Sequence, residues 1–144
     1  MTVKEVKQWL WQVRGIDREI ETLTKTYRIE YARVTSVNAA LDGVSIFGTK
    51  DPHKFDRLAE LGVTIRQRTK DLTDAKNLAI KRINMLEDQR YHDVLMHYYV
   101  NCMTLEQIAV EMHYSFSQVK RLKFEAIQVM KTLLTEAEDE NALE

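Results

Sequence analysis

The feature that most constrains the fold is a run of apolar residues spaced three and four apart through the first third of the chain. The run consists of Val6, Trp9, Val13, Ile16, Ile20, Leu23 and Tyr27. This spacing keeps apolar side chains on one stripe of an α-helix that packs along another helix. We therefore expect one long helix that continues past Tyr31 and Val34 towards Leu41.

The same spacing resumes after a loop. The segment DGVSIFGTKDP contains Gly43 and Gly48, which permit backbone angles that a helix cannot use. Asp51 and Pro52 then favour a new helix start, because Asp accepts hydrogen bonds from free N–H groups and Pro is tolerated at the first helical position. The apolar positions that follow are Leu58, Leu61, Ile65, Leu72, Ala75, Ala79, Ile83 and Leu86.

Two long helices joined by a loop predict an antiparallel hairpin over residues 1–86. Such a hairpin exposes much of its surface, so we expect it to carry self-association of the chain as a homodimer. Gly15 and Gly62 each weaken a helix interior by about 1 kcal/mol relative to Ala. At both positions we expect a bend or the close approach of another helix.

Composition places the chain in the all-α class. It has 144 residues, 44% of them hydrophobic, with four glycines and one proline, too few for the turns of a β fold. Cys102 is the only cysteine, so no intramolecular disulfide can form and a reducing interior is expected. We find neither a bilayer-spanning apolar run nor a signal peptide, and so expect a cytoplasmic protein without a membrane partner.

Shorter helices with clear start signals follow in residues 87–134, after a helix expected over residues 89–100. Thr104 stands three residues before Gln107, and Ser115 stands three before Gln118. Each pair can satisfy the free N–H groups of a helix start reciprocally. Two starts eleven residues apart predict a helix-turn-helix. Its expected inward residues are Leu105, Ile108, Ala109, Met112, Val119, Leu122, Ala126, Ile127 and Met130.

The outer face of the second capped helix is suited to DNA. If Val119 and Leu122 are buried, then Ser117, Gln118 and Arg121 face outward. Gln and Arg can form paired hydrogen bonds with adenine and guanine edges, while Lys and Ser suit phosphate. We therefore predict the DNA-binding residues Ser115, Ser117, Gln118, Lys120, Arg121 and Lys123. The alternative is an ordinary charged face of a core helix.

Charge is distributed unevenly along the chain. The net charge is −1, but residues 135–144 hold five acids and no base, so residues 1–134 carry −1 + 5 = +4. A mildly basic body is compatible with weak non-specific DNA binding. We expect the acidic residues 135–144 to form a flexible tail.

Residues 90–133, RYHDVLMHYYVNCMTLEQIAVEMHYSFSQVKRLKFEAIQVMKTL, resemble the fourth region of bacterial sigma factors. In layout, the whole chain is similar to the phage-encoded ArpU and RinA-like transcriptional regulators of Gram-positive bacteria. The resemblance implies a regulator of late phage or mobile-element genes that binds double-stranded DNA and acts with host RNA polymerase. Two departures concern Gln107, where the family usually has Glu, and Phe116 and Phe124, where polar residues are common.

No other constellation predicts chemistry. His92 and His97 are five residues apart and do not share a helical face, so we expect no metal. No nucleophile, base and orienting acid assemble, and we expect neither an enzyme nor a cofactor. The alternative function is a sigma-like interaction module that binds polymerase or another regulator without reading DNA.

Overall fold

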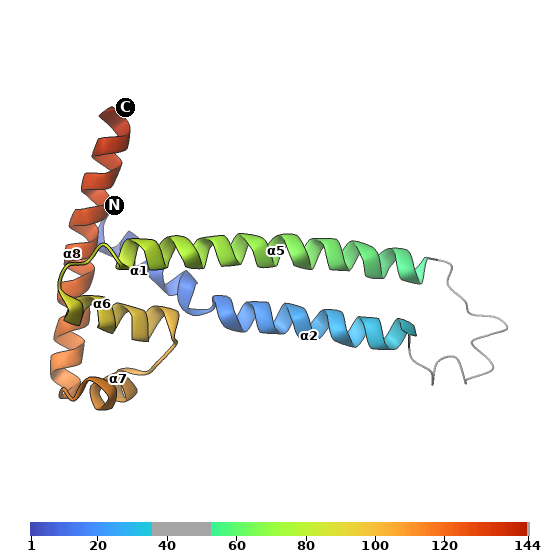
Figure 1. The fold of residues 1–144 in the computed structure, drawn as a ribbon, viewed down its shortest axis with the longest axis horizontal. Coiled ribbons are helices and arrows are strands. Elements are labelled where there is room, and N and C mark those ends of the chain that lie inside the picture. The colour runs from blue at the N-terminus through green and yellow to red at the C-terminus, as the bar shows by residue number, and fades with distance from the viewer. Residues whose placement is uncertain (36–52, 144) are drawn as a thin grey trace. The chain divides into compact units, whose positions relative to one another are not determined.

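The computed structural model describes residues 1–35 and 53–143, and every regular element in these ranges is a helix (Figure 1). This confirms the predicted all-α class. The elements are α1 (Val3–Arg14), α2 (Ile16–Thr35), α5 (Lys54–Ile83), α6 (Gln89–Leu95), the π-helix η1 (Met96–Val100), α7 (Leu105–Met112) and α8 (Phe116–Leu143). The predicted loop, with Gly43, Gly48, Asp51 and Pro52, and the expected helix end near Leu41 lie outside the described residues.

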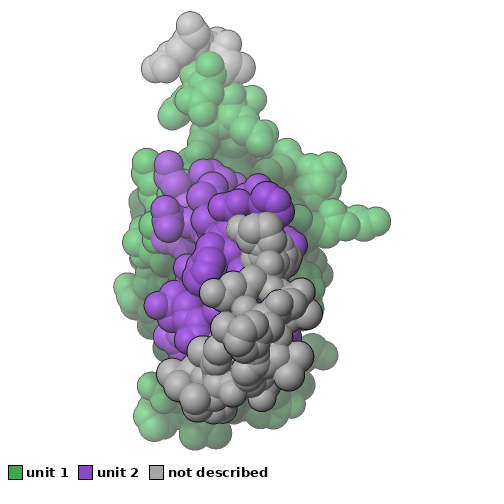
Figure 2. Space-filling model, turned by 90° about the vertical axis from the view of Figure 1, so that its right-hand side faces the viewer, with its two compact units in different colours: residues 1–16, 74–144 green, residues 17–73 purple. Residues whose placement is uncertain are grey.

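The chain forms two compact units, which differ from the predicted division at residue 86 (Figure 2). Unit 1 comprises residues 1–16 and 74–144, and unit 2 comprises residues 17–73. The difference arises because α1 contacts α8 and η1, where Val6, Leu10 and Val13 are buried. The start of the apolar stripe thus belongs to the core of unit 1.

The single first helix predicted from the stripe is instead two helices, because α1 ends at Arg14 and α2 begins at Ile16, on either side of Gly15. Gly15 has φ −90° and ψ −5°, and its N–H donates to the carbonyl of Val13. A methyl group built at Gly15 would have no neighbour within 4 Å, so close packing does not require glycine here. The break lies at the glycine where a bend or a close approach was expected.

Unit 2 contains the predicted antiparallel pairing of α2 with α5. Arg68 forms an ion pair of 2.9 Å with Glu19, while Gly62 lies against Tyr27. Residue numbers that rise along α2 therefore meet falling numbers along α5. A Cβ at Gly62 would lie 3.1 Å from Cε2 of Tyr27, which confirms the close approach expected there. Among the described residues of unit 2, only Leu58 and Leu72 are buried.

Unit 1 has the larger core, formed where α1, α6 and α7 pack on α8 and η1 packs on α1, α6 and α7. α8 then continues to Leu143, so the prediction of a flexible acidic tail from residue 135 was wrong. The segment TEAEDENAL contains neither glycine nor proline and is rich in Glu and Ala, which favour helix. Helix propensity therefore extends α8 past Leu134, the last buried side chain of α8 within the range, up to residue 141, for which burial is described.

Candidate nucleic-acid interface

Two capping boxes define the helix-turn-helix formed by α7 and α8. The Thr104 hydroxyl accepts from the Gln107 N–H at 3.2 Å, and Oε1 of Gln107 accepts from the Thr104 N–H at 2.9 Å. Ser115 and Gln118 repeat this arrangement with the same distances of 3.2 and 2.9 Å. Both predicted helix starts are therefore confirmed.

The turn between the helices is made by a residue in the left-handed conformation. His113 has φ 60° and ψ 40°, an arrangement uncommon for a residue other than glycine. Its backbone reverses direction there, and the N–H of Tyr114 donates to the carbonyl of Ala109 at 2.9 Å. The tight turn fixes the start of α8 relative to α7.

The burial pattern orients the first turns of α8. Val119 and Leu122 are buried in the core cluster with Val94, Ile108 and Ala109. The side chains on the opposite face, Ser117, Gln118, Lys120, Arg121 and Phe124, are exposed. The predicted outer face of this helix is confirmed, and we call these five residues the α8 face.

Ser115 and Gln118 are engaged in capping. The Ser115 hydroxyl and Oε1 of Gln118 each accept a backbone N–H, as described above. A Gln that pairs with adenine uses both its oxygen and its amide N–H. The amide N–H of Gln118 is outside the capping pair, but use of its oxygen for a base competes with the helix start. Gln118 is therefore less suited to base reading than the sequence suggested.

Arg121 is oriented by a chain of contacts from α6. Its Nε lies 3.8 Å from Oε1 of Glu125, whose Oε2 accepts a 3.0 Å hydrogen bond from the Tyr91 hydroxyl. This hydrogen bond is the main reason that the pKa of Tyr91 is raised, because the carboxylate favours the protonated phenol. Arg121 itself is 67% exposed and its guanidinium can meet a ligand.

Lys120 lies beside an exposed aromatic residue. Its ammonium is 5.9 Å from the ring centre of Phe116, one helical turn earlier. Phe124, one turn later, is 56% exposed. The α8 face therefore combines cations with phenylalanine rings, and apolar side chains can contact the methyl group of thymine.

Lys123 does not join the α8 face, contrary to the sequence prediction. Its ammonium lies 4.1 Å from the ring centre of Tyr98 and 5.7 Å from that of Tyr99. Burial, followed by the nearby charges of Lys7 and Arg14, lowers the pKa of Lys123. The structure therefore places this lysine towards α1 and η1.

Charge within the helix-turn-helix is balanced. Residues 104–125 hold three bases, Lys120, Arg121 and Lys123, and three acids, Glu106, Glu111 and Glu125, so that 3 − 3 = 0. Attraction to phosphate must therefore come from the local arrangement of cations and not from a net positive charge of this segment.

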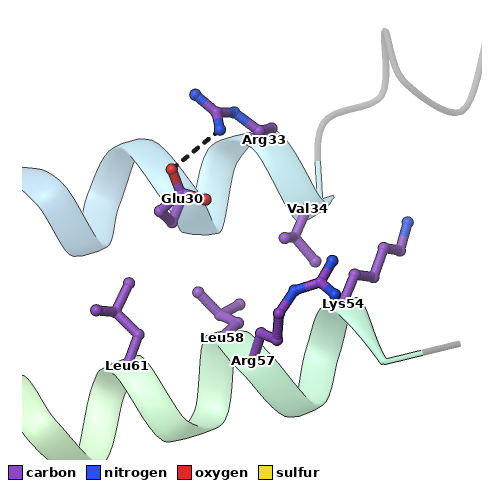
Figure 3. A pocket seen from close by; sticks show the side chains of 7 residues that line it. All are labelled: Glu30, Arg33, Val34, Lys54, Arg57, Leu58 and Leu61. Atoms are coloured by element: carbon purple, nitrogen blue, oxygen red, sulfur yellow. Dashed lines mark ion pairs between the residues drawn. The ribbon is translucent and has the colours of Figure 1, made fainter. Parts of the chain in front are cut away.

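Unit 2 has a hollow of about 480 Å³ between α2 and α5 (Figure 3). Val34, Leu58 and Leu61 contribute apolar side chains, and the basic lining residues are Arg33, Lys54 and Arg57. Arg33 pairs with Glu30 at 3.1 Å. None of the residues that line this hollow is among the predicted DNA-binding residues.

No protein-family model, curated protein or solved structure matches this chain. Among the described residues, no group of three or more His, Cys, Asp or Glu is arranged to hold a metal ion. The helices in the same ranges include none that is both long and apolar enough to span a bilayer.

Proposed function

We propose that the chain is a sequence-specific DNA-binding transcriptional regulator that inserts the start of α8 into the major groove. The observation that carries the proposal is the α8 face: polar and cationic side chains project from the first two turns of a helix whose opposite side is buried. A helix held in this way by a second helix and a tight turn matches the docking geometry of helix-turn-helix proteins.

In this proposal the side chains of the α8 face contact different parts of the DNA. Arg121 reads a base, since its exposed guanidinium can form two hydrogen bonds with guanine. Lys120 and Ser117 contact phosphate, and Phe124 lies against a thymine methyl group. The resemblance to sigma region four and to ArpU and RinA-like regulators supports a role at late phage or mobile-element promoters, together with host RNA polymerase.

The test separates these contacts by measuring the affinity for a selected site and for random duplex DNA across a salt series. Arg121→Ala should lose about 1–3 kcal/mol of discrimination between the two DNAs, because base contacts carry sequence information. Lys120→Ala should weaken binding to both DNAs alike and lower the salt slope by about one unit, since one phosphate contact is lost.

Lys25→Ala is the matched control, because Lys25 is an exposed lysine on α2. It should leave both affinities unchanged. The DNA proposal is rejected if no duplex is selected from a random pool, or if Lys120→Ala and Lys25→Ala bind alike and Arg121→Ala keeps its selectivity.

The alternative is a sigma-like module that binds protein only. The exposed side of α7 supports this alternative. Val110 is 77% exposed there, with Glu106 and Glu111 also exposed. An apolar residue among acids suits a basic, apolar protein surface better than phosphate. Loss of polymerase binding in Val110→Lys, with no selected duplex for the unmodified chain, would favour this alternative.

A further inference from the structure

A hollow of about 490 Å³ opens in unit 1 where α1 meets η1 and α8. Its lining comes from three separate parts of the sequence. α1 contributes Lys7, Gln8, Trp11 and Gln12, while Tyr98 belongs to η1 and Lys123 to α8. We call it the α1–η1 hollow. Its volume is in the range of sites that hold a small ligand or a few side chains.

Two of the side chains that line the hollow, Lys7 and Lys123, are cations. Lys123 stands over the Tyr98 ring, and the guanidinium carbon of Arg14 lies 4.3 Å from the centre of the same ring. In the described part of the chain, no carboxylate forms an ion pair with Lys7 or Lys123. Attraction to the tyrosine ring offsets only part of the cost of burying an ammonium. A bound carboxylate would offset more of it.

Neutral hydrogen-bonding and apolar groups surround these cations. Trp11 is 58% exposed, although burial of a large aromatic side chain away from water is energetically favourable. Gln8 and Gln12 are exposed, one helical turn apart, and their amides can both donate and accept. An isolated anion would use the lysines alone, whereas a peptide would also use the indole and the two amides.

We propose that the α1–η1 hollow binds an acidic segment of a partner protein, with a carboxylate between Lys7 and Lys123 and a neighbouring apolar side chain against Trp11 and Tyr98. The two lysines favour an acidic side chain of the partner because the charges are opposite. The exposed indole favours an apolar side chain next to it. The proposal does not depend on DNA binding, because none of these residues belongs to the α8 face.

Duplex DNA is a poorer occupant. Lys123 is half-buried on the side of α8 that faces α1 and η1, where a flexible carboxylate side chain can reach its ammonium. The phosphates of a duplex lie on a rigid, convex surface and are best met by exposed cations. The side chains of Lys120 and Arg121 meet that requirement, whereas the half-buried ammonium of Lys123 does not.

The test uses a fluorescein-labelled peptide of sequence Asp-Phe-Asp-Leu-Asp-Phe and measures its anisotropy as full-length protein is added. The unmodified chain should bind this peptide saturably, and the peptide with every Asp replaced by Asn should bind about tenfold more weakly. Lys123→Met should also reduce the affinity about tenfold, because it removes the ammonium but keeps an unbranched chain over Tyr98.

Lys25→Met is the matched control and should bind the acidic peptide as the unmodified chain does. Trp11→Ala provides a second variant at an exposed position, and it should weaken the acidic peptide while the circular dichroism stays unchanged. The proposal is overturned if the Asp and Asn peptides bind alike, or if Lys123→Met and Lys25→Met have the same affinity. The hollow would instead be assigned to phosphate if random duplex DNA displaces the peptide from the unmodified chain and Lys123→Met no longer binds that DNA.

Discussion

At the scale of single residues, Arg14 connects segments that are far apart in the sequence. Its Nε donates to the carbonyl of Tyr98 at 3.1 Å, and one terminal nitrogen donates to the carbonyl of Met103 at 3.3 Å. Its own carbonyl accepts a 2.7 Å contact from the thiol of Cys102, which has a φ of 57°. Arg14 thus satisfies carbonyl groups that the π-helix and the following turn leave without helical partners.

Arg14→Lys should destabilise the protein, because lysine keeps the charge but cannot present the rigid donor fork to two carbonyls. We expect a loss of about 1.5–3 kcal/mol in the free energy of unfolding, the usual range for hydrogen bonds that involve a charged group. Urea denaturation followed by circular dichroism measures it. Arg18→Lys, at an exposed position of α2, is the control. Equal stability of the two variants would show that the donor fork is dispensable.

At the scale of elements, Gly15 and Gly62, the two glycines among the described residues, differ in their surroundings. Gly15 separates α1 from α2, has ordinary right-handed backbone angles and has open space where a side chain would begin. Gly62 lies within α5, where Tyr27 occupies the position next to the missing side chain. Both residues are glycine, but only at Gly62 does the missing side chain allow another side chain, that of Tyr27, to approach the backbone closely.

Gly15→Ala should therefore stabilise the protein by up to about 1 kcal/mol, the difference in helix propensity between the two residues. Gly62→Ala should gain less or lose stability, because its Cβ would lie 3.1 Å from the Tyr27 ring and the ring must shift. The melting temperatures of both variants, measured by thermal unfolding, show which substitution stabilises the protein more. A larger gain for Gly62→Ala than for Gly15→Ala would contradict the packing seen in unit 2.

Features that depend on residues close together in the sequence could be predicted, whereas contacts between distant residues could not. Capping by Thr104 and Ser115 depends on partners three residues away, so the starts of α7 and α8 could be predicted. The orientation of the α8 face followed from helix periodicity. The contact of Arg14 with Tyr98 spans 84 residues and has no local signal. For the same reason, the sequence could not show that Lys123 lies towards α1 and η1 and not on the α8 face.

At the scale of the whole chain, the distribution of buried residues differs sharply between the two units. Unit 1 contains nearly all of the buried apolar side chains, whereas unit 2 has only Leu58 and Leu72 among its described residues. Unit 2 also exposes the large apolar residues Ile29, Tyr31, Phe55 and Val63. Two helices with so small a core gain little free energy from burying apolar surface on their own.

We therefore expect unit 2 to bury its apolar surface against a second copy of the chain, as the sequence predicted. Light scattering should show a molar mass that rises towards that of a dimer with increasing concentration. Val63→Lys should shift this transition to higher concentration, because Val63 is 62% exposed and a lysine there would place a charge in the interface. Val110→Lys is the matched control, since Val110 is similarly exposed but lies on α7 of unit 1. A monomer at every concentration would mean that the hairpin is stable without a partner, and equal effects of the two variants would place the interface elsewhere.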